Sequence, residues 1–179
     1  PIMPSHLILD AHSHTTHSDG YLTPRESIMW HYKNGFNAMV ITDHNLFLED
    51  TEYTELKDFA DSLGVVLLNG NEWSTRRLHL VLVGSTSFNV INPSTLHLTM
   101  PSDNDIIDVI QETHDNGGIV IAAHLTYNFD QQPTHQQLIN WGVDYIEIAN
   151  DGVFDPIGWN LHLLGKTGSI CTTDVHMPS

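Results

Sequence analysis

Seven runs of apolar, mostly β-branched residues recur along the chain. They are nearly continuous rather than alternating, a pattern typical of strands buried on both faces of a sheet. The sequence therefore predicts strands within residues 7–12, 38–44, 65–72, 79–84, 118–124, 145–150 and 169–176.

Most of these runs are separated by segments with helical signals. The first such segment begins with Thr23, Pro24 and Glu26, a capping-box signature, and stops at Gly35. The predicted helices lie within residues 23–35, 50–64, 102–118, 134–142 and 158–168. Strands that alternate with helices predict an α/β fold with a largely parallel sheet, either open or closed as a barrel. We expect residues 85–101, rich in Asn, Ser, Thr and Pro, to form a loop with little regular structure.

Length and composition narrow the class of protein. A chain of 179 residues, 40% of them hydrophobic, predicts a single domain over residues 1–179. The sequence has neither an apolar stretch of membrane-spanning length nor a secretory signal, so we expect a cytoplasmic protein with no membrane partner. The single cysteine, Cys171, excludes an internal disulfide and a thiolate zinc site.

The charge is strongly acidic, with 22 acidic and 6 basic residues and a formal net charge of −16. Such a surface repels polyanions, which argues against long DNA or RNA as a partner. The 13 histidines are the other anomaly, because each is a potential metal ligand or proton carrier near neutral pH.

The ends of the predicted strands carry many histidines and carboxylates. In parallel α/β folds these ends meet at one rim of the sheet, where functional residues lie. The residues at these ends are His12, His14, Asp43, His44, Glu72, His124, Asp174 and His176. Each feature alone has a structural explanation, but so many buried polar groups at one rim would need partners, and metal ions supply them. The other histidines have no such register, and we expect surface or hydrogen-bonded core positions for His6, His31, His97, His114, His135 and His162.

Five motifs follow one another within residues 10–176 and read "HSHTTHSDG", "ITDHN", "GNEWSTRRLH", "IVIAAH" and "TTDVH". In this order they resemble the motifs of the PHP (polymerase and histidinol phosphatase) domain, a family of metal-dependent phosphoesterases. The resemblance implies a distorted (β/α)7 barrel in one compact domain, which agrees with the seven apolar runs.

Carried over position by position, the resemblance implies a trinuclear metal site. The ligands of the first ion would be His12, His14, Glu72 and Asp174. Those of the second would be Glu72, as a bridge, with His79 and His124. Those of the third would be Asp19, His44 and His176. His79 begins its apolar run rather than ending it, so only the resemblance selects it.

Nitrogen and oxygen ligands of this kind suit two or three manganese, iron or zinc ions, and the set does not choose among them. Paired ions lower the pKa of a bound water to about 7 and clamp the attacking and leaving oxygens. We therefore expect a hydroxide that bridges the first two ions to attack the phosphorus of a small phosphorylated substrate. The third ion would neutralise a phosphoryl oxygen.

A few other polar residues are candidates for supporting roles. Arg76 and Arg77 are the only adjacent bases, and guanidinium groups match phosphate, so either is a candidate for substrate binding; the alternative is an exposed pair. Asp10 and Asp43 directly precede ligand segments and would either orient imidazoles or cap turns. His17, at a variable position of the first motif, would be an outer hydrogen-bond donor or exposed to solvent.

Two other functions remain open at this point. A similar centre could hydrolyse a C–N bond, as in amidohydrolase-like barrels, although no lysine lies at a predicted strand end. A noncatalytic PHP-like domain could also bind metal or a partner. The arginine that often follows the fourth-motif histidine in members acting on phosphodiesters or nucleotides is absent from "AHLTYNF". The sequence therefore does not separate a monoester from a diester substrate, name the native metal or give the oligomeric state.

Overall fold

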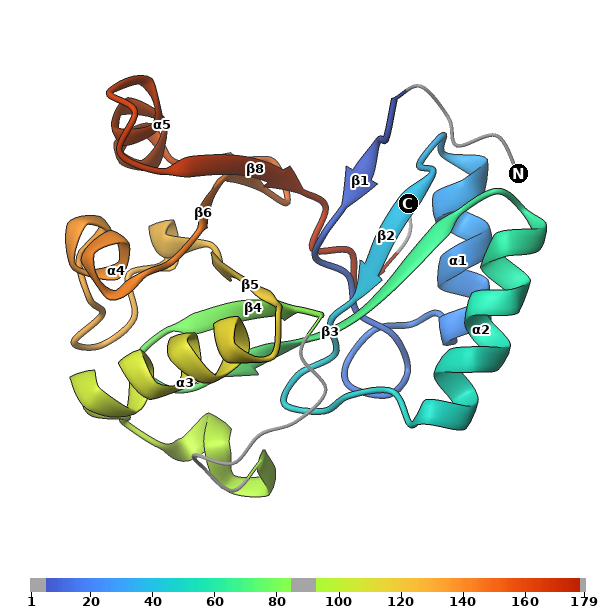
Figure 1. Cartoon of the computed structure of the whole chain (residues 1–179), viewed down its shortest axis with the longest axis horizontal. Helices are drawn as coiled ribbons and strands as arrows, with labels where there is room; N and C mark the ends of the chain where they lie inside the picture. The colour runs from blue at the N-terminus through green and yellow to red at the C-terminus, as the bar shows by residue number, and fades with distance from the viewer. Residues whose placement is uncertain (1–5, 85–92, 178–179) are drawn as a thin grey trace.

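The computed structural model describes residues 6–84 and 93–177. Within them, one curled sheet of eight strands carries helices on its outside (Figure 1). Neighbouring strands follow the order β1-β2-β3-β4-β5-β6-β7, and β8 pairs with β6. The strands are β1 (Leu9–Asp10), β2 (Ala38–Ile41), β3 (Val66–Ser74), β4 (His79–Val83), β5 (Ile119–Ala122), β6 (Tyr145–Asn150), β7 (Val153–Phe154) and β8 (Gly168–Thr172). All seven predicted strands are present, and only the short β7 was not expected.

The sheet is mixed rather than largely parallel, because β4 runs against both of its neighbours and the short β7 runs against β6. Only residues 75–78 connect β3 to β4, whereas a parallel pairing needs a crossover of roughly a dozen residues. Thr75 closes this connection, donating to the carbonyl of Leu78 from its N–H over 3.1 Å and from its hydroxyl over 2.8 Å. The pairs β1–β2, β2–β3, β5–β6 and β6–β8 are parallel, as predicted.

The sheet curls until its two sides meet at one rim. Just beyond β1 and β8, Ser13 forms an isolated parallel bridge with Val175. Two backbone hydrogen bonds flank the bridge: the N–H of His14 donates to Val175 over 3.1 Å, and that of Asp174 donates to His12 over 2.9 Å. The opposite ends of β1 and β8 lie far apart (Figure 1). The result is a distorted barrel that closes only where the strand ends carry histidines, and it confirms the predicted fold class.

The predicted helices are all present. They are α1 (Pro24–Lys33), α2 (Asp50–Ser62), α3 (Asp103–Asp115), α4 (His135–Trp141) and α5 (Pro156–Leu163). At the start of α1, Glu26 N–H donates to the Thr23 hydroxyl over 3.3 Å and Thr23 N–H donates to the Glu26 carboxylate over 2.9 Å, which completes the expected capping box. The expected loop at residues 85–101 contains a 3₁₀ helix, η1 (Pro93–Leu98), and residues 85–92 lie outside the described residues.

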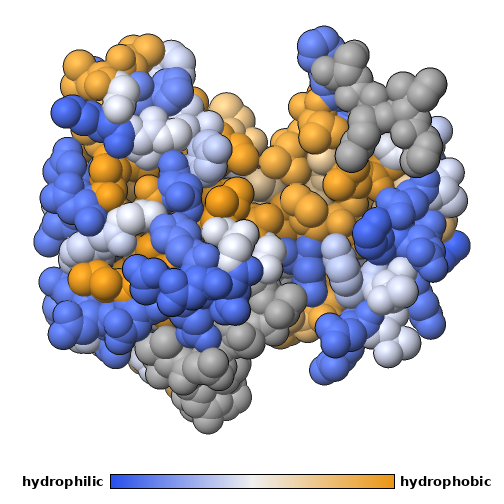
Figure 2. Space-filling model, viewed as in Figure 1, coloured by the Kyte–Doolittle hydropathy of each residue, from blue (hydrophilic) through white to orange (hydrophobic). Residues whose placement is uncertain are grey.

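Alternate residues of the strands pack on opposite faces of the sheet, which explains why the apolar runs are continuous. On β2, Met39 packs outward against α1 and α2, while Val40 belongs to a cluster inside the barrel. On β4, Leu80 packs outward with α3 and α4, while Val81 lies inside. Figure 2 shows the hydrophobic residues in the hollow between the two halves of the molecule. Among the described helices, none combines the length and the hydrophobicity needed to cross a membrane.

Candidate metal centre

The nine predicted ligands converge on the closed rim of the barrel. Their candidate ligand atoms fall into four overlapping sets, and within each set these atoms lie within 4.8 Å of one another. The sets are His12, His14 and Glu72; His12, His124 and Asp174; His44, Glu72 and His79; and His14, Asp19, His44 and His176. Most of the nine residues follow the carboxyl ends of strands, but His79 begins β4. Because β4 runs antiparallel, its first residue lies at the rim where its neighbours end, directly opposite Ser74 at the end of β3. The short connection between these two runs is the sequence signal that could have placed His79.

Four buried side chains form the first group. The Nε2 atoms of His12 and His14 lie 3.1 Å apart, and each lies 3.2 Å from Oε2 of Glu72. Oδ1 of Asp174 lies 3.2 Å from Nε2 of His12 and 3.1 Å from Nε2 of His14. Donor atoms around one tetrahedral ion, at bond lengths of about 2.1 Å, lie roughly 3.4 Å apart. Each carboxylate therefore lies from His12 and from His14 at about the spacing that two ligands of one ion would have.

The second group uses the other oxygen of Glu72. Its Oε1 lies 2.8 Å from Nδ1 of His79 and 2.9 Å from Nε2 of His124. On the Oε2 side, Nδ1 of His44 lies 3.0 Å away. One buried carboxylate therefore faces two groups at once, which is the arrangement a bridging ligand requires.

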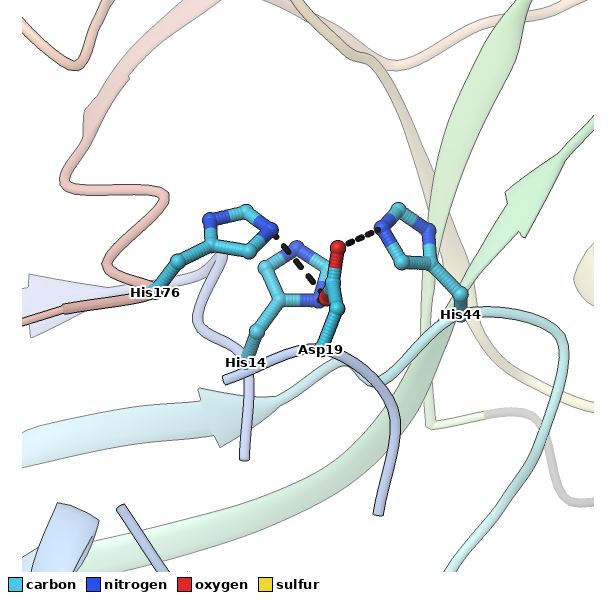
Figure 3. Close-up of side chains that lie close together, drawn as sticks. All are labelled: His14, Asp19, His44 and His176. Atoms are coloured by element: carbon cyan, nitrogen blue, oxygen red, sulfur yellow. Dashed lines mark ion pairs between the residues drawn. The ribbon is translucent and has the colours of Figure 1, made fainter. Parts of the chain in front are cut away.

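The third group is the most open to solvent. Figure 3 shows the Asp19 carboxylate between the imidazoles of His44 and His176, with His14 beside them. Asp19 lies 3.4 Å from Nε2 of His44 and 3.2 Å from Nε2 of His176, and its side chain is 56% exposed. Nδ1 of His14 lies 3.6 Å from the same carboxylate, while its Nε2 belongs to the first group. His14 thus joins the buried and the open parts of the centre.

Three buried polar atoms of the centre have no hydrogen-bond partner among the described residues: Oε2 of Glu72, Oδ1 of Asp174 and Nδ1 of His124. Leaving a buried polar atom unpaired costs about 1–3 kcal/mol. A cation between the two oxygens and their neighbouring imidazoles would remove most of that cost. Carboxylate and imidazole ligands suit Mn²⁺, Fe²⁺ and Zn²⁺, so the residues present fit the divalent ions that the resemblance implies.

The charged states of these groups depend on one another. Burial alone would lower the pKa of His14, but the nearby carboxylates of Asp174 and Glu72 outweigh it and raise the pKa to about 9. The pKa of His12 is also raised well above its usual value, against the effect of burial, by Glu147, Glu72 and Asp174. Burial would raise the pKa of Asp174, yet the charge of His12 and the contact with His14 lower it to about 2. Without metal, the carboxylates are therefore ionised and the imidazole pair holds protons.

Asp10 and Asp43 do not orient the ligand imidazoles, which corrects one of the two roles considered for them. Asp10 accepts from Nε2 of His31 over 3.0 Å, from the N–H of Thr173 over 3.0 Å and from the Thr173 hydroxyl. Asp43 accepts from the N–H of Thr15 over 2.7 Å and from its hydroxyl over 2.6 Å. Both carboxylates therefore hold the turns that carry the ligands, which is the alternative role.

Other side chains take the orienting role. Nδ1 of His12 donates to the buried carboxylate of Glu147 over 2.7 Å, and Nδ1 of His44 lies 2.6 Å from the Ser74 hydroxyl. The sequence analysis did not select Glu147 as functional. A carboxylate inside the apolar run "YIEIAN" was the available signal, because a charge in a strand buried on both faces needs a partner.

The two arginines differ in their surroundings. The guanidinium of Arg77 forms an ion pair with Asp103 at 2.6 Å and donates to the backbone carbonyls of Gln131 and Pro101 over 2.8 and 3.0 Å. The guanidinium of Arg77 is therefore already engaged in contacts that link neighbouring loops. Arg76 is exposed on the connection between β3 and β4, so the predicted phosphate contact is available to Arg76 and not to Arg77 as placed.

The histidines outside the centre have surface or hydrogen-bonded positions, as expected. Carboxylates accept from His31, His114 and His135 over 3.0, 2.8 and 2.6 Å. His162 donates to a backbone carbonyl over 3.2 Å, and His6 and His97 are exposed. His17 is exposed too and pairs with Glu52 at 2.7 Å, so it takes no part in the centre.

Two cavities adjoin the centre. The larger, of about 730 Å³, reaches Asp19, His44 and His79 and extends to Thr75 and His97. The smaller, of about 360 Å³, is lined by Trp30, Asp151, Thr173, Asp174, Val175, His176 and Met177. Both are large enough for part of a small organic molecule whose reactive group lies at the centre.

Two aromatic rings hold the imidazoles of the second group. Tyr127 stacks on His124 with ring centroids 4.4 Å apart, and Phe129 stacks on His79 at 4.7 Å. Tyr127 is 53% exposed, so its other side faces solvent beside the centre.

Comparison with known proteins identifies the architecture. No protein-family profile matches the chain. Among solved structures, the chain is similar to a two-domain protein of Bacteroides vulgatus that contains a predicted PHP-like metal-dependent phosphoesterase, with a TM-score of 0.74 and 22% identity. The chain has the PHP fold. The similarity covers 96% of this chain and 52% of that protein, so this chain spans about half of that protein's length.

Further similarities to the PHP fold have lower identity. A candidate metal-dependent phosphoesterase of Bifidobacterium adolescentis matches with a TM-score of 0.70 and 17% identity, over 97% of this chain and 89% of the other. An amidohydrolase of Chromobacterium violaceum, with bound sulfate and no metal, matches with a TM-score of 0.69 and 16% identity, over 96% and 88%. These similarities concern the fold alone.

One curated relative matches in sequence. A 5′-3′ exoribonuclease of Haemophilus influenzae is 33% identical over 76 residues, which are 40% of this chain and 27% of that protein. The matched part is therefore well under two thirds of the length of this relative.

Proposed function

We propose that the chain is a metal-dependent phosphoric ester hydrolase that acts on a small phosphorylated substrate with two to three divalent ions. The observation that carries the proposal is the convergence of nine histidine and carboxylate side chains on one rim, where buried carboxylate oxygens without a well-formed hydrogen bond among the described residues face several imidazole nitrogens. The names of two solved structures with this fold support this reaction class, since one contains a predicted PHP-like metal-dependent phosphoesterase and the other is a candidate metal-dependent phosphoesterase.

The ligand groups have distinct roles in this proposal. The first group would hold one ion away from solvent, Glu72 would bridge it to a second, and the open third group would hold another beside the larger cavity. When bound, such ions would supply Lewis acidity at the phosphoryl group and make a water acidic enough to lose its proton near pH 7. The chain itself keeps the first group dry, orients the imidazoles and leaves the third group accessible to the substrate.

Charge favours a small substrate over a polymer. Three divalent ions would bring the formal charge from −16 to −10, since they add six positive charges. The surface would stay acidic while the centre became positive, so a phosphate would be attracted only at the rim. Arg76, exposed near this rim, is the candidate to contact a second phosphate oxygen. Because the curated relative is an exoribonuclease, short nucleotides belong among the substrates to be tested.

A second candidate is hydrolysis of a C–N bond. The observation in its favour is the similarity to the Chromobacterium violaceum amidohydrolase. Amidohydrolase-like barrels commonly use a metal-bridging modified lysine, whereas the bridging position here is taken by Glu72. The phosphoesterase therefore remains the better explanation of this ligand set.

The test combines metal analysis with a substrate panel. Protein purified with Mn²⁺ would be analysed for bound metal and assayed on phosphomonoesters, phosphodiesters, dinucleotides and amides. We expect two to three ions per chain and activity on a phosphoester that Glu72→Gln abolishes. Glu55→Gln, an exposed change on α2, is the matched control and should keep both. Absence of bound metal, or activity on an amide with none on any phosphoester, would refute the proposal.

A further inference from the structure

Glu147, on β6, is a completely buried carboxylate that the proposed chemistry does not use directly. Its two oxygens accept four hydrogen bonds. Oε1 accepts from Nδ1 of His12 over 2.7 Å and from the hydroxyl of Thr172 over 2.8 Å. Oε2 accepts from the backbone N–H of His124 over 2.8 Å and from the side-chain amide of Asn150 over 2.9 Å. All four partners act as donors, so the site is built for a group that only accepts.

The bond to His12 determines which ring nitrogen faces the first group. Because Nδ1 donates its N–H to Glu147, Nε2 is the nitrogen that faces Glu72 and Asp174, and its lone pair would be free for an ion there once the ring is neutral. A carboxylate behind a metal-binding imidazole also makes that imidazole a stronger ligand. Glu147 therefore acts on the first group through His12.

The bond to His124 acts on the second group through the backbone. The backbone angle φ of His124 is +29°, a value that residues other than glycine rarely adopt. The backbone N–H is fixed by Glu147, while Nε2 of the ring lies 2.9 Å from Oε1 of Glu72. Without the bond to Glu147, the peptide could relax toward an ordinary conformation and move the imidazole away from Glu72.

We propose that Glu147 is a positioning residue that couples the first and second metal sites, one through the tautomer of His12 and the other through the strained backbone of His124. The inference rests on the metal centre of the proposed function. It makes a selective claim, because the structure gives Glu147 no contact with Asp19, His44 or His176. Loss of the carboxylate should weaken two sites and spare the third.

The decisive variant is Glu147→Gln. The amide has the same shape, but its NH₂ group would face two donors at one of the two oxygen positions. Removal of such a partner behind a metal ligand typically lowers metal affinity by about 10–100-fold. We expect this loss at two of three binding steps, with the third unchanged. The unfolding transition of each metal-free variant would be measured first.

Asp155→Asn is the matched control. Asp155 is also a buried carboxylate that accepts from an imidazole, Nε2 of His135 at 2.6 Å, and from two backbone N–H groups, those of Ile157 and Gly158, at 3.0 Å. Its partners lie outside the centre. A general loss of stability would affect both variants, whereas a selective loss of metal affinity should appear only in Glu147→Gln.

Zn²⁺ titration of the metal-free protein by calorimetry would give the three affinities. NMR of the zinc-loaded protein would follow the ring proton on Nδ1 of His12, which should be shifted downfield and protected in the wild type and lost in Glu147→Gln. If Glu147→Gln does not fold, two milder variants test the same role of Glu147. Thr172→Val should weaken only the first site, and Asn150→Ala only the second, each by about threefold.

The outcomes are distinct from those of the proposed function, since no catalytic assay is used. A wild type that binds no metal would remove the metal centre and this proposal together. A wild type that binds three ions, with Glu147→Gln equal to it at every step, would overturn the coupling role and leave the phosphoesterase proposal intact. Equal weakening of all three steps, or the same loss in Asp155→Asn, would show a merely structural role for Glu147.

Discussion

Metal binding at the first group should release protons near neutral pH. In the metal-free protein the carboxylates of Asp174 and Glu72 raise the pKa of His14 to about 9, against the effect of its burial, and the pKa of His12 is raised as well. An ion can bind only to the unprotonated nitrogens of these rings. The two carboxylates have lowered pKa values and release no proton.

The size of the effect follows from the pKa of His14. At pH 7 the ring is two units below a pKa of about 9. Removing that proton costs about 3 kcal/mol, at 1.36 kcal/mol per unit, or a factor of about 100 in the apparent affinity of the first ion. We therefore expect the affinity to rise about tenfold per pH unit between pH 7 and pH 9, and to level off above.

Calorimetric titration in two buffers with different heats of ionisation measures the number of protons directly. Metal-free protein titrated with Zn²⁺ at pH 7 should release at least one proton with the first ion. The number should fall by about one between pH 7 and a pH well above 9, as His14 loses its proton before the ion binds. His135→Ala, outside the centre, is the control and should release the same number. Release of less than half a proton at pH 7, or one affinity across this pH range, would refute the reasoning.

The same pKa values predict how the metal-free protein responds to pH. The raised pKa of His14 stabilises the fold fully when the pH is below about 6.5, the pKa of the imidazole in the unfolded chain. This stabilisation is lost as the pH rises toward 9. The lowered pKa of the Asp174 carboxyl stabilises the fold above pH 3.8, and this stabilisation is lost as the pH falls toward 2. The two pKa shifts arise from the same contact between His14 and Asp174, so the two losses of stability are not added. Urea unfolding with chelator should show less stability at pH 9 than at pH 6.5, and added Zn²⁺ should reverse that order.

The remaining predictions concern five single substitutions. Gly20→Ala would place a Cβ 2.5 Å from backbone atoms of the first-motif loop, so we expect a loss of about 1–3 kcal/mol in unfolding free energy and about tenfold weaker binding of the third ion. Gly35→Ala, with open space and φ of +87°, should cost about 1–2 kcal/mol in unfolding free energy and leave metal binding unchanged. Arg76→Ala should raise KM for a phosphoester severalfold, whereas Arg77→Ala should lower unfolding free energy by about 1–2 kcal/mol. Leu80→Ala, in the outer core, should cost about 2–5 kcal/mol in urea unfolding with the ion count unchanged.

These predictions fail in recognisable ways. Equal effects of the two glycine variants on the third ion would show that the close approach of the first-motif loop does not position Asp19. An unchanged KM in Arg76→Ala would remove the proposed phosphate contact. Loss of bound metal in Leu80→Ala would show that the core and the centre are coupled more tightly than their separation across the sheet implies.

The sequence by itself determined the strands and the helices. Apolar runs, capping boxes and terminal glycines are local signals, because each acts within a few residues of its own position. The resemblance carried by the five motifs predicted the nine candidate ligands, and the fold brings all nine together on one rim.

Only the tertiary structure decided the direction of β4, the partners of the carboxylates and the part played by Glu147. The antiparallel β4 brings His79 to the rim. Asp10 accepts a hydrogen bond from a turn rather than from a ligand imidazole. Glu147, which lies within an apolar run and was not selected from the sequence, accepts from His12 and from the backbone of His124. The physical reason is that a hydrogen bond needs two atoms within about 3 Å, and which distant segments come that close depends on how the whole sheet closes.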